Sequence, residues 1–176
     1  MKGVFFIESL LEKLSSYNLL NNLLPGAIFC YLLKTIVNID ISNNIVEDLF
    51  VYYFIGMIIS RIGSIIIEPI YKKLEIVKYV DYKSFLKASK FDEKINILSE
   101  TNNMYRTFVA LTITLGLIKV YIVLAKKFDI LSIIEPYLII IILIVVFSVS
   151  YRKQVKYIKD RTEVTLEDNN SNNVDR

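Results

Sequence analysis

Four apolar blocks set the main constraint on what this chain can fold into. They cover residues 19–37, 49–70, 107–125 and 131–151, and each is close to the length of about 20 residues that crosses a bilayer as a helix. A soluble domain of 176 residues would spread its apolar residues along the chain, whereas here 54% of the residues are hydrophobic and they gather into blocks. The pattern predicts an all-α integral membrane protein, a four-helix bundle made of two helical hairpins.

The polar segments around the blocks predict the topology. A basic segment at residues 71–106 separates the second and third blocks, and another begins at residue 152, after the fourth block. With four spans, both basic segments lie on one side of the membrane, which the positive-inside rule makes the cytoplasmic side. We therefore expect transmembrane hairpins at 19–70 and 107–151, a basic helical insert in the cytosol at 71–106, and both termini in the cytoplasm.

The two ends of the chain are expected to lie outside the bundle. Residues 1–18 place apolar residues at helical spacing, which predicts an amphipathic helix on the membrane surface or against the bundle. Glu8 and Glu12 interrupt its apolar stretch, so we do not expect a signal peptide. Residues 152–176 begin basic and then hold few apolar residues, which predicts a disordered tail from Thr162.

Ionisable residues inside apolar blocks need a partner or a route to water. Lys119 and Glu135 lie at equal distances from the centre of the second predicted hairpin, and Lys34 and Asp48 do so in the first. Each pair predicts an ion-pair clamp between neighbouring spans, or two side chains that extend to the interface.

Arg61 has no such symmetrical partner. Glu68 lies seven residues later on almost the same stripe of the helix, and the lean of helical side chains toward the N-terminus tilts Glu68 toward Arg61. We predict a contact between them through water or another polar group. Pro69 frees a backbone carbonyl nearby, which is a further acceptor for the guanidinium.

Small residues on the same span predict a close helix contact. They recur at about every fourth position, an interval that lets two helices approach closely. These residues are Gly56, Ser60, Gly63 and Ser64. The contact is either within the chain, against the first or third span, or between the subunits of an oligomer.

Composition argues against two classes of function. The chain has no histidine and shows no nucleophile–base set and no metal-ligand cluster, so we expect neither catalysis, a cofactor nor a metal. The net charge of +3 is too small, and the lysines too closely tied to the spans, for nucleic-acid binding. The bias toward Ile, Lys and Asn is typical of an AT-rich microbial genome, so we expect a plasma membrane, specifically a bacterial inner membrane.

The favoured function is a non-enzymatic interaction, sensor or scaffold subunit that acts through the cytosolic insert. The expected partners are the bilayer, anionic lipid headgroups, and either a cytosolic protein or a second copy of the chain. Each basic residue near the membrane is worth about 1 kcal/mol toward anionic lipid. The predicted interaction residues are Lys72, Lys73, Lys83, Lys87, Lys90, Asn102, Asn103, Tyr105 and Arg106. The alternative is an oligomeric channel or a membrane-permeabilising effector with a polar stripe at Arg61 and Glu68.

Overall fold

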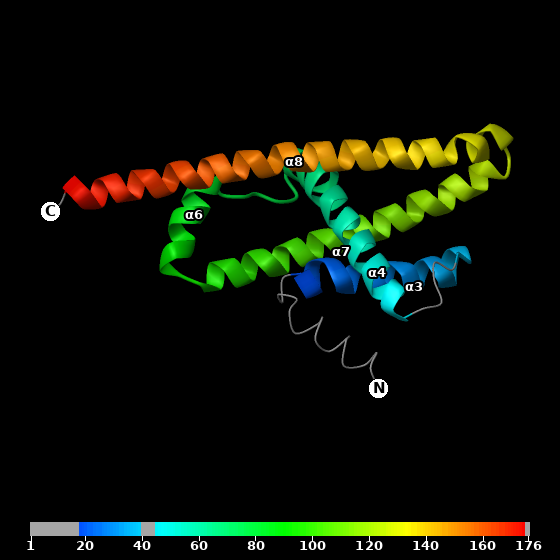
Figure 1. Cartoon of the computed structure of the whole chain (residues 1–176), viewed down its shortest axis with the longest axis horizontal. Helices are drawn as coiled ribbons and strands as arrows, with labels where there is room; N and C mark the ends of the chain where they lie inside the picture. The colour runs from blue at the N-terminus through cyan, green and yellow to red at the C-terminus, as the bar shows by residue number, and fades with distance from the viewer. Residues whose placement is uncertain (1–17, 40–44, 175–176) are drawn as a thin grey trace.

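The computed structural model describes residues 18–39 and 45–174, and all the regular secondary structure in these residues is helical (Figure 1). This confirms the all-α class. The elements are η1 (Leu19–Leu23), α3 (Leu24–Leu32), η2 (Leu33–Val37), α4 (Ile45–Ile62), η3 (Gly63–Ile67), α5 (Glu68–Lys73), α6 (Tyr82–Phe91), α7 (Lys94–Ala125) and α8 (Asp129–Val174), where η marks a π-helical segment. The amphipathic helix predicted for residues 1–18 falls outside the described residues, except for Asn18.

Three helices are long and apolar enough to cross a membrane, judged by length and composition. They are Ile45–Lys73, Lys94–Ala125 and Ile133–Glu167, which have 29, 32 and 35 residues. The first predicted span forms a shorter apolar helix, Asn21–Val37. It ends at Asn38, whose left-handed backbone (φ 61°) stops the helix, and asparagine tolerates that conformation well. The helices support the assignment to membrane proteins.

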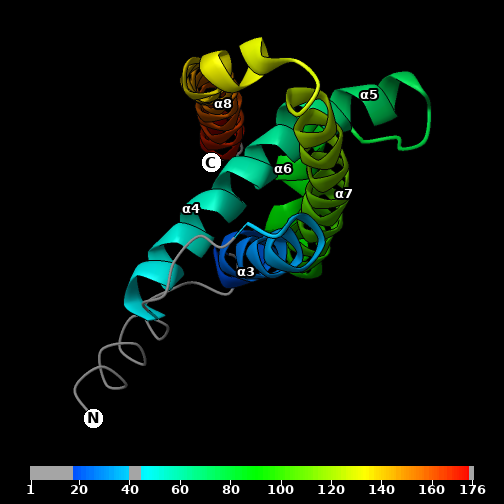
Figure 2. The same ribbon diagram turned by 90° about the vertical axis from the view of Figure 1, so that its right-hand side faces the viewer.

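The helices are not arranged as a simple pair of hairpins. α7 and α8 form one hairpin around residues 126–128, and they diverge toward the other end, where α6 lies between them (Figure 1). α3 runs along the same general direction as α7, but α4 crosses these helices steeply (Figure 2). The predicted four-helix bundle is therefore not shown by the structure, although its second hairpin is present.

Two glycines explain the steep crossing of α3 and α4. Gly26 on α3 lies against the backbone of Tyr52, and Gly56 on α4 lies against the backbone of Asn22, so that a Cβ atom at either glycine would overlap the opposite helix. Such backbone contact between helices requires small residues. The direction of α4 thus follows from glycine positions rather than from the length of the apolar blocks.

The buried core lies among α3, α4 with η3, and α7. Its members are Phe29, Cys30, Leu33, Ile59, Ile67, Ala110, Leu111 and Leu115. α8 contributes little to it, because most of its apolar side chains between residues 133 and 145 are exposed. The apolar side chains of this part of α8 thus remain largely uncovered by the described residues.

The C-terminal part of α8 is helical where the sequence predicts disorder. The helix continues from Thr162 through Val174. Val164 is buried, and Glu163 forms an ion pair of 2.9 Å with Lys83 of α6. A prediction from average composition overlooks the buried Val164 and the ion pair that joins Glu163 to α6.

Candidate functional site

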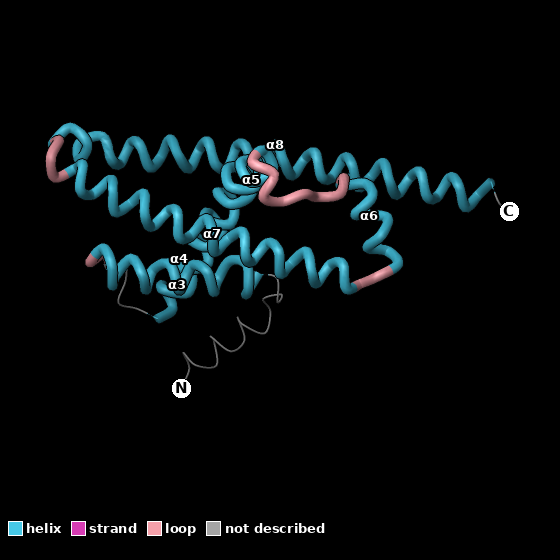
Figure 3. The backbone as a smooth tube through the Cα atoms, turned by 180° about the vertical axis from the view of Figure 1, so that it is seen from behind, coloured by secondary structure: helices cyan, strands magenta, loops and turns pink. Residues whose placement is uncertain are grey.

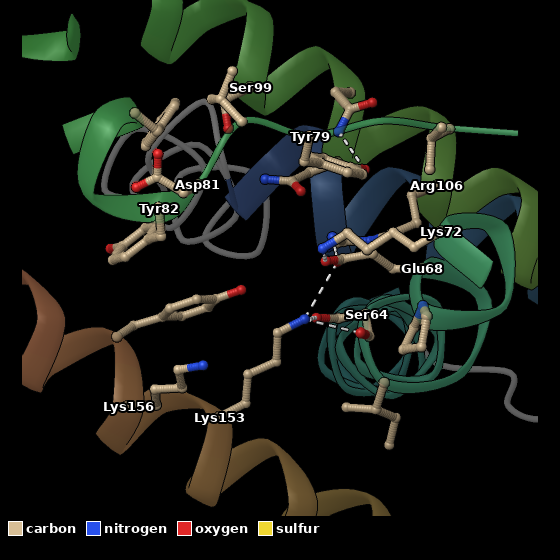
Figure 4. Close-up of a pocket in the computed structure, with 18 of the residues that line it drawn as sticks. Ser64, Glu68, Lys72, Tyr79, Asp81, Tyr82, Ser99, Arg106, Lys153 and Lys156 are labelled. Atoms are coloured by element: carbon tan, nitrogen blue, oxygen red, sulfur yellow. Dashed lines mark hydrogen bonds and ion pairs between the residues drawn. The ribbon is translucent and has the colours of Figure 1, made fainter. Parts of the chain in front are cut away.

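Glu68, in the first turn of α5, is the centre of a charged cluster. It is buried, with 7% of its side chain exposed, and its carboxylate forms ion pairs with basic side chains of three helices (Figure 4). Lys72 Nζ lies 2.7 Å from Oε1, while Arg106 Nη1 of α7 and Lys153 Nζ of α8 lie 2.6 and 3.3 Å from Oε2. We call these four residues, together with Ser64, the Glu68 cluster. It joins α5, α7 and α8 through one carboxylate.

A π-helical turn supplies the backbone acceptor of this cluster. In η3 the Glu68 N–H donates to the carbonyl of Gly63, five residues earlier. In the same pattern of bonds between residues five apart, the carbonyl of Ser64 would accept from the N–H of residue 69. That residue is Pro69, which has no N–H to donate. Lys153 Nζ donates to that carbonyl at 2.9 Å and to the Ser64 hydroxyl at 2.7 Å. The local sequence Gly63–Pro69 therefore creates the point at which α8 attaches.

The cluster lies where three apolar segments end. Glu68 follows the apolar part of α4 and η3, Arg106 directly precedes the apolar block of α7, and Lys153 follows that of α8 by two residues. Charged groups at the end of a membrane-spanning helix are tolerated when they pair with one another. The cluster thus ties together the polar ends of the three candidate spans.

Arg61 and Glu68, for which the sequence predicts a contact through water or another polar group, do not bond to each other directly. The oxygens of Glu68 are occupied by Lys72, Arg106 and Lys153, and no hydrogen bond or ion pair between Arg61 and Glu68 is present among the described residues. η3 lies between the two, and its wider turn rotates the later residues around the axis, so that Glu68 leaves the stripe of Arg61. Periodicity computed for a regular α-helix could not reveal this rotation.

A pocket of about 1170 Å³ opens beside the Glu68 cluster. Its walls come from α4, α5, α6, α7, α8 and the connection from α5 to α6, which is drawn as a loop in Figure 3. Six basic side chains line it, namely Arg61, Lys72, Lys78, Arg106, Lys153 and Lys156. Figure 4 shows Lys153 and Lys156 projecting from α8 on the wall opposite Ser64 and Glu68. Cations predominate over the four acidic side chains in this lining.

α6 closes the polar end between α7 and α8. Asp81 caps its N-terminus and accepts a hydrogen bond of 2.9 Å from the Ser84 N–H, an interaction that lowers the pKa of Asp81. The hydrogen bond and the charge of Glu163 raise the pKa of Lys83, which directly follows Tyr82, the residue whose ring contacts Tyr157 of α8. The connection to α8 therefore consists of a charge pair beside a ring contact.

The predicted charge clamps do not appear as ion pairs. Lys119 Nζ donates to the carbonyl of Ile36 at 2.8 Å. In residues 18–39 and 45–174, no ion pair joins Lys119 to Glu135 or Lys34 to Asp48. Depth matching around a turn places two residues at similar height, but it does not determine toward which neighbour each side chain turns.

The predicted small-residue face packs within the chain. Gly56 contacts η1 and α3, whereas Gly63 lies against the Arg106 backbone and Ala110 of α7. Ser60 is buried. Both glycines therefore make the close contacts within the chain that the first alternative predicts, and the oligomer alternative is not tested.

Six of the nine predicted interaction residues belong to the cluster, bond within the chain or line the pocket. Lys72 and Arg106 belong to the cluster, and Lys83 and Lys87 pair with acids of α8. Asn102 donates to the Tyr79 hydroxyl, and Asn103 lines the pocket described above. Lys73, Lys90 and Tyr105 are exposed. The prediction missed Lys153, although its position two residues after the fourth block places it at the depth of Glu68 and Arg106.

The described residues contain no group of three His, Cys, Asp or Glu side chains arranged to hold a metal ion. No protein-family model matches the chain, and a search of curated proteins and of solved structures finds no similar protein.

Proposed function

We propose that this chain is a multi-pass membrane protein that acts as a non-enzymatic interaction subunit and presents its polar end to a protein partner in the cytoplasm. The observation that carries the proposal is the Glu68 cluster. It joins the ends of three candidate spans through a single buried carboxylate, so the polar end is preorganised. A preorganised surface binds a partner with a smaller entropic penalty than a flexible loop does.

The position of the cluster supports the four-span topology. Glu68, Arg106 and Lys153 belong to span ends that this topology places on one side, and the lysine-rich segments lie on the same side. The positive-inside rule makes that side cytoplasmic. The short helix Asn21–Val37 then serves as the first span, at the lower end of the usual range of about 17–25 residues. The proposed location is a bacterial inner membrane with both termini in the cytoplasm.

Large apolar side chains exposed at the polar end favour a protein as the partner. Phe91 and Leu98 are 92% and 67% exposed, and Tyr105 follows Leu98 by seven residues on the same side of α7. In the proposed topology these side chains face water rather than lipid. Apolar residues gathered on a water-facing, ordered surface are typical of a site for protein binding. We call Phe91, Leu98 and Tyr105 the apolar face.

The alternative, an oligomeric channel along Arg61 and Glu68, receives less support. Glu68 would have to face a water path, but its carboxylate is occupied by three cations and is buried inside the chain. Ion flux through liposomes that contain the wild-type protein or Arg61→Ala tests this alternative directly. Flux that depends on Arg61 would favour the channel.

Affinity capture from the native membrane tests the interaction subunit. The full chain carries a tag, and the wild type is compared with Leu98→Ser in the apolar face. Leu166→Ser is the matched control, because Leu166 is 58% exposed on α8, outside that face. We expect one protein to be retained by the wild type and by the control but lost with Leu98→Ser. Equal capture by all three forms, or a chain that emerges alone, would contradict the proposal.

A further inference from the structure

We propose that the pocket beside the Glu68 cluster binds a phosphate group. Its charged lining consists of six basic and four acidic side chains, a surplus of two positive charges. Three of the acids are already engaged. Glu68 holds three cations, Glu75 lies 3.6 Å from Lys78, and Asp81 caps α6. The surplus is therefore not neutralised within the pocket.

Two of the lining cations have no acidic partner. Among the described residues, Arg61 of α4 and Lys156 of α8 form neither a hydrogen bond nor an ion pair. Arg61 lies inside a candidate span, and arginine is the cationic side chain best suited to bind an anion through two parallel hydrogen bonds. An unpaired guanidinium at such a position is unfavourable, and an anion bound in the pocket would satisfy it.

A phosphate group matches this arrangement better than a single carboxylate does. It offers several strong acceptor oxygens and can neutralise more than one cation, whereas arginine donates to it in bidentate fashion. Uncharged donors complete the lining, among them the side chains of Tyr82, Ser99 and Asn103. The volume of about 1170 Å³ also leaves room for the group that carries the phosphate.

The phosphate has two possible sources. A phospholipid headgroup lies at the depth where the candidate spans end, and Ile65 and Val149 continue the pocket wall toward the exposed apolar surface of α8. A free organophosphate would enter from water on the side of Asp81 and Ser99. Both sources offer the same chemistry to Arg61 and Lys156. Neither source depends on the protein partner proposed above.

The test uses the purified full chain in detergent and two binding measurements. Native mass spectrometry follows the binding of added phosphatidylglycerol, and calorimetry follows titration with inorganic phosphate and with glycerol 3-phosphate. The variants are Arg61→Gln and Lys156→Gln, with Arg152→Gln as the control. Arg152 is exposed beside the pocket but is not part of its lining. Lys156 is exposed too, so its replacement leaves the fold intact even if Arg61→Gln does not.

We expect each pocket variant to weaken binding about ten-fold, since each removes one charge-assisted contact, and Arg152→Gln to change it less than two-fold. If the pocket variants weaken the binding of phosphatidylglycerol but neither soluble phosphate binds, the ligand is a phospholipid headgroup. The same dependence with a soluble phosphate identifies a free anion. If Arg152→Gln weakens binding as much as the pocket variants do, or if no probe binds, the proposal is overturned.

Discussion

Replacing Glu68 by glutamine tests whether the cluster holds the three candidate spans together. The change keeps the size of the side chain but removes the charge that Lys72, Arg106 and Lys153 share. Because Glu68 is 7% exposed and Arg106 is 15% exposed, the lost interaction is a buried one. Removing one partner of a buried ion pair destabilises a protein by about 3–5 kcal/mol, chiefly because the remaining charges stay buried without compensation.

The assay is thermal unfolding of the purified protein in a mild detergent. A loss of about 3–5 kcal/mol corresponds to a fall in Tm of roughly 6–20 °C for a chain of this size, at about 2–4 °C per kcal/mol. Lys72→Gln is the matched control, because Lys72 is 45% exposed and an exposed pair contributes about 0–1 kcal/mol. A Tm for Glu68→Gln that equals that of Lys72→Gln would refute the role assigned to the cluster.

Three further changes test the contacts that position the site. Gly56→Ala should lower the Tm despite the better helix propensity of alanine, because its methyl group would overlap the backbone of η1, whereas Gly116→Ala, which meets open space, should raise stability by about 1 kcal/mol. The pKa of Asp81 is lowered in the folded state, so the stability from its cap is present above its ordinary pKa of about 3.9 and is lost as the pH falls through the lower folded value. The protection factors of the α6 amides, taken relative to the intrinsic exchange rate at each pH, should therefore fall in acid, and Asp81→Asn should weaken this pH dependence. Val164→Asp should release the end of α8 from α6, which limited proteolysis after residue 161 would detect, and unchanged cleavage would contradict that contact.

The sequence predicted the helical class and the three helices that are long and apolar enough to span a membrane, because these depend on composition over long windows. It also identified Glu68 and Arg106 as notable residues. It could not pair them, since they are 38 positions apart and meet only through the crossing of α4 on α7. At that crossing Gly63 lies against the Arg106 backbone and Ala110 of α7, a close contact that a pattern of apolar residues does not encode.

The lack of a direct bond between Arg61 and Glu68 has a local cause. A prediction that assumes a regular α-helix keeps residues seven apart on one stripe, and η3 breaks that assumption. The sequence predicts that Pro69 frees a backbone carbonyl for Arg61. The freed carbonyl is that of Ser64, and it accepts a hydrogen bond from Lys153 instead. Pro69 thus indicated an irregular hydrogen bond, but the donor lies 89 residues away in the sequence, on α8.

The two proposals concern the same polar end of the molecule, where cations outnumber acids in the lining of the pocket. In the cluster, Lys72, Arg106 and Lys153 share the single carboxylate of Glu68, and this pairing brings together the ends of three candidate spans. Positive charge at the ends of spans sets the orientation of a membrane protein, and the acids of the pocket lining neutralise only a part of it here. The remainder is present in the folded protein and makes the pocket beside the cluster attractive to an anion. A phosphate group bound at Arg61 and Lys156 would neutralise part of this surplus, and a variant that reverses the charge of Arg61 should weaken phosphate binding.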